Sequence, residues 1–234
     1  MRVTGVDACR RGWVAVTLDD TGTAVVRVDE TLAGLLGRET ARDTGDGTGH
    51  GAGGTGAVTG IDMPLGLLET GWREADLAAR RLLGPRRSSV FAIPPRPVWE
   101  QASYAAAGQR CRELTGQGFS IQAWGLRARL LEADRYRETC RHPLYEVHPE
   151  LAFGAMAGAP LPHSKHTEAG RELRRTLLSQ AGILLPPVPR APVTDTLDAA
   201  AVAWTARRIA AGQAVVLPEV PQRDDRGGEI AIRY

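Results

Sequence analysis

Acidic residues stand at the edges of three separated apolar stretches of this chain. Asp7 and Asp62 each end a short apolar stretch, and Asp195 with Asp198 opens a long one over residues 194–211. The short stretches have the length of buried strands, whereas the long one has the length of a helix. A fold that brings these points together makes a carboxylate cluster, which commonly serves to hold a divalent metal ion over a phosphodiester.

Length and composition favour a single globular domain over residues 1–234. Hydrophobic residues make up 43% of the 234 residues, which suffices for a core in a domain of this size. The formal net charge of +2 is too small to indicate nucleic-acid binding by itself. The local distribution of charge must therefore decide that question.

The cysteines and the N-terminus bear on the compartment. Cys9, Cys111 and Cys140 show no C-x-x-C spacing, so the sequence predicts neither a disulfide framework nor a zinc knuckle. The first residues lack the long apolar segment of a signal peptide, and no apolar run approaches the length of a membrane span. We therefore expect a cytoplasmic protein without a membrane partner.

The apolar patterns predict alternating strands and helices. Strands are expected at residues 2–7, 12–18, 23–28, 57–62 and 144–148, and residues 229–234 alternate like an edge strand. Helices are expected at residues 31–42, 72–83, 98–114, 120–141, 168–181 and 194–211. The Gly- and Thr-rich residues 43–56 predict a flexible loop. Residues 65–119, interrupted by prolines, predict an insertion after the fourth strand.

This order of elements is that of the ribonuclease H-like fold. The fold belongs to the α/β class and has a mixed five-stranded sheet, flanked by helices, whose second strand is antiparallel. The sequence therefore predicts this sheet with a helical insertion over residues 65–119.

Five separated motifs carry a resemblance to a known family. They read GVDACRRGW at 5–13, IDMPLGL at 61–67, RRSSVF at 86–91, EVHPE at 146–150 and TDTLDA at 194–199. Together they resemble the DUF429 family of predicted ribonuclease H-like nucleases, over nearly the whole chain. The resemblance implies a nuclease. Relatives of the resolvase type often pair, so a homodimer is one candidate state, but no feature of the sequence fixes the oligomeric state.

The resemblance also implies roles for the acidic residues. The Asp-x-x-Asp-Ala motif of Asp195 and Asp198 is similar to the final helix of Holliday-junction resolvases of this fold, in which both aspartates join the metal site. Asp7 matches the aspartate of the first strand, and Asp62 matches the acid of the fourth. Those resolvases usually carry Glu at the fourth-strand position, so the shorter Asp62 could alter the metal spacing.

The expected metal is Mg²⁺ or Mn²⁺, with Asp7, Asp62 and Asp198 as ligands and Asp195 and Glu150 as further catalytic candidates. Four acids gathered without a cation would repel one another and raise their pKa values. Each acid also has a simpler interpretation. The strand-end aspartates could take backbone hydrogen bonds in turns, and the helix aspartates could cap and stabilise the helix N-terminus.

Glu146, His148 and Glu150 stand at alternate positions, so one continuous strand would point them to the same face. We expect Glu150 near Asp62 on that face, with His148 and Glu146 supporting the ligands. The alternative is that Glu146 pairs with an arginine of the insertion and that His148 forms hydrogen bonds in the core.

Positive charge concentrates in the insertion. Residues 72–112 hold eight arginines against three acidic residues, and the whole chain has a single lysine, Lys165. Such a surface suits phosphate, and aromatic residues such as Trp99 and Tyr104 could stack on bases. The candidate substrate-binding residues are Arg10, Arg80, Arg86, Arg87, Ser88 and Lys165. The alternatives are a genome that favours arginine codons, and a solvated helix face with aromatic packing.

These observations predict a metal-dependent nuclease that hydrolyses phosphodiester bonds in DNA or RNA. An alternative is a non-catalytic module that binds nucleic acid or a nucleotide on the same scaffold. A third hypothesis is phosphoryl transfer, as in sugar kinases, but those proteins use two such domains and this chain has room for one.

Overall fold

A mixed five-stranded sheet forms the centre of the computed structural model, which describes residues 2–43, 58–140, 142–187 and 191–234. The sheet order is β3-β2-β1-β4-β5. The strands are β1 (Val3–Cys9), β2 (Gly12–Leu18), β3 (Ala24–Asp29), β4 (Val58–Asp62) and β5 (Leu144–Glu146). β1 is antiparallel to β2 and parallel to β4, and β4 is parallel to β5. The predicted α/β sheet is confirmed, and its order is consistent with a ribonuclease H-like fold.

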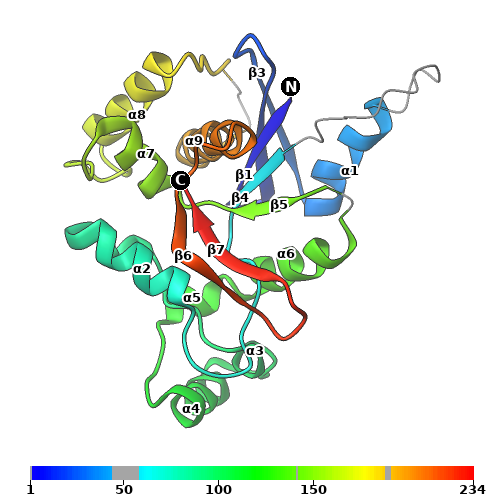
Figure 1. Cartoon of the computed structure of the whole chain (residues 1–234), viewed down its shortest axis with the longest axis vertical. Coiled ribbons are helices and arrows are strands. Elements are labelled where there is room, and N and C mark those ends of the chain that lie inside the picture. The colour runs from blue at the N-terminus through cyan, green and yellow to red at the C-terminus, as the bar shows by residue number, and fades with distance from the viewer. Residues whose placement is uncertain (1, 44–57, 141, 188–190) are drawn as a thin grey trace.

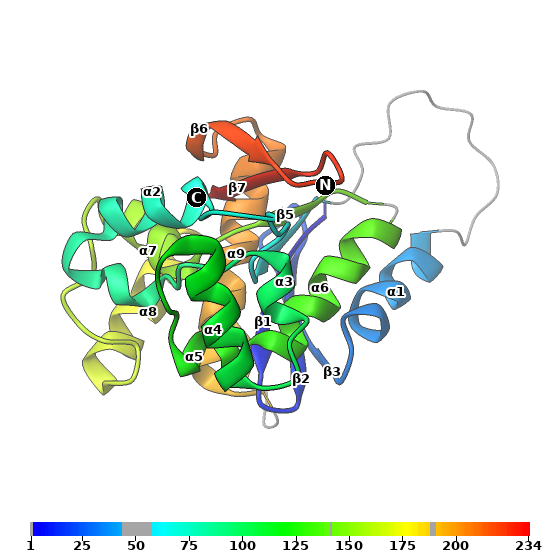
Figure 2. The same cartoon turned by 90° about the horizontal axis from the view of Figure 1, so that it is seen from below.

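Helices cover both faces of this sheet (Figures 1 and 2). One face packs against α7 (Pro149–Ala157), α8 (Glu168–Gln180) and α9 (Val193–Ala210), and the other packs against α1 (Leu32–Asp43), α5 (Ile121–Gly125) and α6 (Arg127–Thr139). β2 contributes to both cores because its side chains alternate: Val14 and Val16 face the α9 side, and Trp13 and Ala15 face the α1 side.

The helix α9 lies unusually close to β1, and glycine makes this possible. A Cβ atom at Gly5 would lie 2.1 Å from the carbonyl oxygen of Ala199 and 2.1 Å from the backbone nitrogen of Ala203. Gly60 on β4 allows a similar approach, since its Cβ would lie 2.8 Å from Cγ1 of Val202. The close packing brings the first half of α9 beside the ends of β1 and β4.

The segment after β4 contains α2 (Glu74–Leu83), the 3₁₀ helix η1 (Gly84–Ser89), α3 (Arg96–Trp99) and α4 (Tyr104–Thr115). Its aromatic side chains pack on one another. The ring of Trp99 is stacked on that of Trp124 at 6.2 Å, and Phe119 contacts both rings edge-on. Tyr104 joins the group and donates its hydroxyl to the carbonyl oxygen of Phe119 at 2.7 Å.

Several predicted elements differ from the structure. The helix predicted over residues 98–114 is interrupted after Trp99 and forms α3 and α4. The helix predicted over residues 120–141 is divided at Leu126 into α5 and α6. The strand predicted over residues 144–148 ends at Glu146, because Pro149 occupies the first turn of α7, where its fixed φ and missing N–H favour a helix start. The tail strand β7 (Glu229–Arg233) pairs with β6 (Val216–Arg223), which was not predicted, in a separate two-stranded sheet.

The predicted flexible loop at 43–56 falls almost wholly on residues 44–57, which lie outside the described residues. No helix among the described residues is long and apolar enough to cross a membrane.

Candidate active site

Two aspartates lie side by side where the central parallel strands end. Asp7 on β1 and Asp62 on β4 are register partners, and neighbouring strands are about 4.8 Å apart. Asp7 is 7% exposed, and both residues line a cavity of about 500 Å³. The strand order thus brings together two acids that are 55 residues apart in the sequence, as predicted.

The helix α9 adds Asp198 and Asp195 to the same cavity. Asp198 is 1% exposed, and the ammonium Nζ of Lys165 donates a hydrogen bond to its Oδ2 at 2.6 Å. The other oxygen, Oδ1, is buried and has no hydrogen-bond partner among the described residues. The helix begins after Pro192, so Asp195 lies in its first turn and is not the N-cap.

Burial and neighbouring carboxylates raise the pKa values of Asp7, Asp62 and Asp195. Burial raises the pKa of Asp7 well above its ordinary value, and the charges of Asp62 and Asp198 raise it further. Burial also raises the pKa of Asp62 to about 7, although the ammonium of Lys165 opposes this increase. The pKa of Asp195 is raised as well, first by burial and then by Asp198. The cluster therefore holds more potential negative charge than one ammonium group balances.

Lys165 places a positive charge beside these acids. Burial disfavours its charged form, but Asp198, Asp62 and Asp7 together raise its pKa above the ordinary value. It lies on the segment between α7 and α8 and is one of the residues predicted to bind substrate. Sequence reasoning identified Lys165 but did not predict that it would pair with Asp198, because no local pattern links residues 33 positions apart.

The carboxylates of the cluster are chemically suited to bind a divalent cation, but their present positions do not form a complete metal site. Carboxylate oxygens are the ligands preferred by Mg²⁺ and Mn²⁺, and the buried Oδ1 of Asp198 has a free acceptor position. Within the described part of the chain, however, no three His, Cys, Asp or Glu side chains are already grouped as a metal site. Carboxylate rotation and release of Lys165 from Asp198 would be needed to complete one.

Glu146 forms a buried ion pair behind the cluster. Its Oε2 accepts hydrogen bonds from Nη2 of Arg73 at 2.5 Å and from the backbone N–H of Leu65 at 2.8 Å. Arg73 also lies 3.6 Å from Asp76, whose pKa burial raises to about 7. The pairing of Glu146 with an arginine of the insertion, one of the two sequence interpretations, is therefore observed. Sequence reasoning missed Asp76, although its position three residues after Arg73, at the start of a predicted helix, was a usable signal.

Glu150 and His148 do not share one strand face, and that prediction was wrong. Because the chain enters α7 at Pro149, Glu150 lies in the first turn of a helix. Its Oε2 accepts a hydrogen bond from Nη2 of Arg174 at 2.6 Å, which joins α7 to α8. Nε2 of His148 lies 3.1 Å from the carbonyl oxygen of Ser89, and burial lowers the pKa of this imidazole. Both residues line the cavity.

The predicted substrate-binding residues are dispersed. Arg86, Ser88 and Lys165 line the cavity, whereas Arg10, Arg80 and Arg87 are absent from its walls. Arg86 also donates to the carbonyl oxygens of Leu161 and Pro162, and thereby holds the segment that carries Lys165. Arg80 donates to the carbonyl oxygen of Val90 at 2.5 Å.

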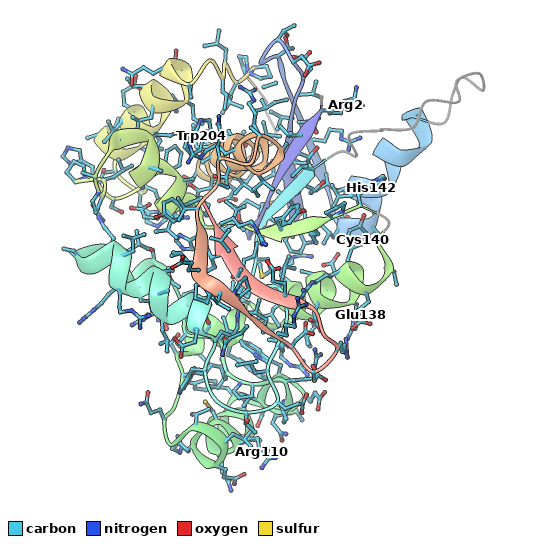
Figure 3. All side chains as sticks on the ribbon, viewed as in Figure 1. Arg2, Arg110, Glu138, Cys140, His142 and Trp204 are labelled. Atoms are coloured by element: carbon cyan, nitrogen blue, oxygen red, sulfur yellow. The ribbon has the colours of Figure 1, made fainter. Side chains whose placement is uncertain are left out.

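Most arginines of the insertion have structural partners. Besides Arg73, Arg80 and Arg86, Arg96 donates to Asp134 at 2.8 Å and Arg110 donates to Glu113 at 3.1 Å. Arg110 lies at the end of the molecule far from Trp204 of α9 (Figure 3). The aromatic residues Trp99, Phe119 and Trp124 are likewise occupied by one another. The insertion is thus held by its charges and rings. The aromatic packing agrees with the simpler interpretation, but Arg73 and Arg96 lie in buried ion pairs and not on a solvated helix face.

Comparison with known proteins identifies a family. No curated protein and no solved structure matched the chain. The family model described as "Protein of unknown function (DUF429)" matches residues 5–223. This match covers every motif on which the resemblance rested, from the strand of Asp7 to the helix of Asp198. The chain therefore belongs to the DUF429 family.

Proposed function

We propose that this protein is a metal-dependent nuclease that hydrolyses phosphodiester bonds, with Asp7, Asp62 and Asp198 as ligands of Mg²⁺ or Mn²⁺. The observation that carries the proposal is the convergence of these three acids, from two strand ends and one helix, on one cavity. The raised pKa values of Asp7 and Asp62 support it, because a buried acidic cluster gains most from a divalent cation.

The protein side chains divide the remaining tasks. When bound, Mg²⁺ or Mn²⁺ would supply acidity to water and positive charge to a phosphate. Lys165, once it leaves Asp198, can donate to a phosphate oxygen, since an ammonium is a mobile donor of three hydrogen bonds. Asp195 adds a fourth aspartate to the cavity wall, and Arg174 holds the carboxylate of Glu150 in place.

Cleavage and metal binding test the proposal together. Asp7→Asn should lose cleavage of labelled DNA and RNA in Mg²⁺ or Mn²⁺ and should bind Mn²⁺ more weakly by calorimetry, while its circular dichroism is unchanged. Glu172→Gln, which alters an exposed carboxylate on α8, is the matched control and should behave as the parent protein. Equal activity in clean preparations of the parent and the Asp7→Asn variant would refute the mechanism.

The second candidate is a non-catalytic module that binds nucleic acid or a nucleotide. The ion pair of Lys165 with Asp198 favours it, because this pair satisfies part of the cluster's charge without metal. It predicts salt-sensitive ligand binding, no dependence on divalent ions and no turnover. Binding that survives EDTA, together with no cleavage in either metal, would select this candidate.

A further inference from the structure

The walls of the cavity restrict what can reach the acidic cluster. The cavity measures about 500 Å³ and has the acids Asp7, Asp62 and Asp198 on its surface. Cavities of roughly 300–1,000 Å³ enclose most of one small organic molecule. One nucleotide is of this size, whereas a base-paired duplex is far too wide to enter.

Apolar side chains form much of the remaining wall. Phe91, Met63 and Leu126 line the cavity together with Val90 and Ile93. Phe91 is only partly buried, so part of its ring surface is available to a ligand. A phosphate group alone would gain nothing from this surface, but a flat base would, because bases stack on aromatic and apolar side chains.

The surface of the insertion outside the cavity offers few free arginines or aromatic rings to contact a long duplex. Seven of the eight arginines in the insertion do not line the cavity, and four of these donate to protein acceptors, namely Arg73, Arg80, Arg96 and Arg110. The rings of Trp99, Phe119 and Trp124 are packed against one another. Most of the arginines and aromatic rings that the sequence suggested for binding a nucleic-acid backbone therefore stabilise the fold instead.

A buried carboxylate oxygen without a partner also favours ligand binding in the cavity. Asp198 is 99% buried, lines the cavity, and has an oxygen without a hydrogen-bond partner in the described chain. On the same cavity, Lys165 and Ser88 add donors suited to phosphate oxygens.

From these four features we propose that the cavity binds a single unpaired nucleotide, with its base against Phe91 and its phosphate at the acidic cluster. The proposal rests on the proposed nuclease function and names its substrate class. The nucleotide can come from a single strand or from a free dinucleotide, since both present the same chemistry to the cavity. A paired duplex is excluded because its bases cannot enter.

The test compares four phosphodiesters in Mn²⁺: a labelled single strand, the same strand annealed to its complement, a dinucleotide and bis(4-nitrophenyl) phosphate. We expect the single strand to be cleaved at least about tenfold faster than the duplex. If the single strand is cleaved faster than the dinucleotide, the nucleotide comes from a single strand. If the dinucleotide is cleaved faster, the nucleotide comes from a free dinucleotide. Equal rates on single strand and duplex would overturn the proposal while leaving the nuclease function intact. Failure to hydrolyse any of the four, the small chromogenic diester included, would instead refute the nuclease function.

Two variants test the cavity itself. Phe91→Ala should raise KM for the single strand by about tenfold, and Ser88→Trp, at an exposed position on the cavity wall, should obstruct entry and reduce cleavage similarly. Val220→Ala, which trims an apolar side chain 82% exposed on β6, is the matched control. Fluorescence anisotropy of a labelled trinucleotide, with Ca²⁺ in place of Mn²⁺, gives a readout independent of turnover. Unchanged KM and unchanged binding in both cavity variants would refute the proposal.

Discussion

Replacing Asp62 by Asn should stabilise the metal-free protein at alkaline pH. The pKa of Asp62 is about 7 in the fold against 3.8 for an unperturbed aspartate, chiefly because of burial. Between these values the folded protein holds a proton that the unfolded chain has lost, so the free energy of unfolding decreases as pH rises from about 4 to 7. Above pH 7 the ionised carboxylate imposes its full cost on the fold.

The magnitude follows from this difference in proton affinity. At about 1.4 kcal/mol for each tenfold change, the full cost is on the order of 4 kcal/mol. Asp62 keeps some contact with solvent, which screens its charge, so we expect the variant to gain about 2 kcal/mol at pH 8. The gain should be absent at pH 4. Asp7 acts in the same direction, because burial and, after it, the charge of Asp62 raise its pKa.

Urea unfolding in EDTA, followed by circular dichroism from pH 4 to 8.5, measures this effect. Glu172→Gln on α8 serves as the control, since its carboxylate is exposed. Adding Mn²⁺ should stabilise the parent protein at pH 8 and stabilise the Asp62→Asn variant less. Parallel pH profiles for parent and variant, or a less stable variant at pH 8, would show that the ionised carboxylate of Asp62 does not destabilise the fold.

Three further substitutions test separate parts of the structure. Lys165→Met removes the charge that lowers the pKa of Asp62. The acidic side of the pH profile for Mn²⁺ binding should therefore move to higher pH, and an unchanged profile would show that Lys165 does not lower this pKa. Glu146→Gln leaves the buried guanidinium of Arg73 short of a charge partner and should lower the free energy of unfolding by about 3 kcal/mol in urea; a loss below about 1 kcal/mol would argue against a buried pair. Gly5→Ala places a methyl group against the backbone of α9 and should cost about 3 kcal/mol and weaken Mn²⁺ binding; unchanged thermal unfolding would disprove the close approach.

The sheet and the first two acids could be predicted because their signals are local. Short apolar stretches that end in aspartate mark both strand ends, and the order of elements then sets Asp7 beside Asp62. The long apolar stretch at the C-terminus likewise predicts α9. The depth of its packing on β1 was a less obvious result, since it depends on Gly5 meeting the backbone of α9.

The partners of charged side chains could not be predicted in the same way. Counting arginines gives the charge of a segment, but whether Arg96 faces solvent or Asp134 depends on contacts between distant elements. Glu150 was misplaced for a local reason that the sequence did contain. Proline followed by glutamate favours the first turn of a helix, and this signal outweighs the alternation that predicted a strand.

The position of the single lysine bears on why the chain otherwise prefers arginine. If codon bias alone set the choice of cation, the exception would have no reason to fall beside the acidic cluster. A guanidinium is planar and favours a bidentate pair with one carboxylate, whereas an ammonium is a compact charge with three donors. Lys165 donates to Asp198 and also acts electrostatically on Asp7 and Asp62. A compact charge can serve several carboxylates in turn and then release them to a divalent cation, which a bidentate arginine would do less readily. The exception to the arginine preference therefore supports a functional role for this lysine.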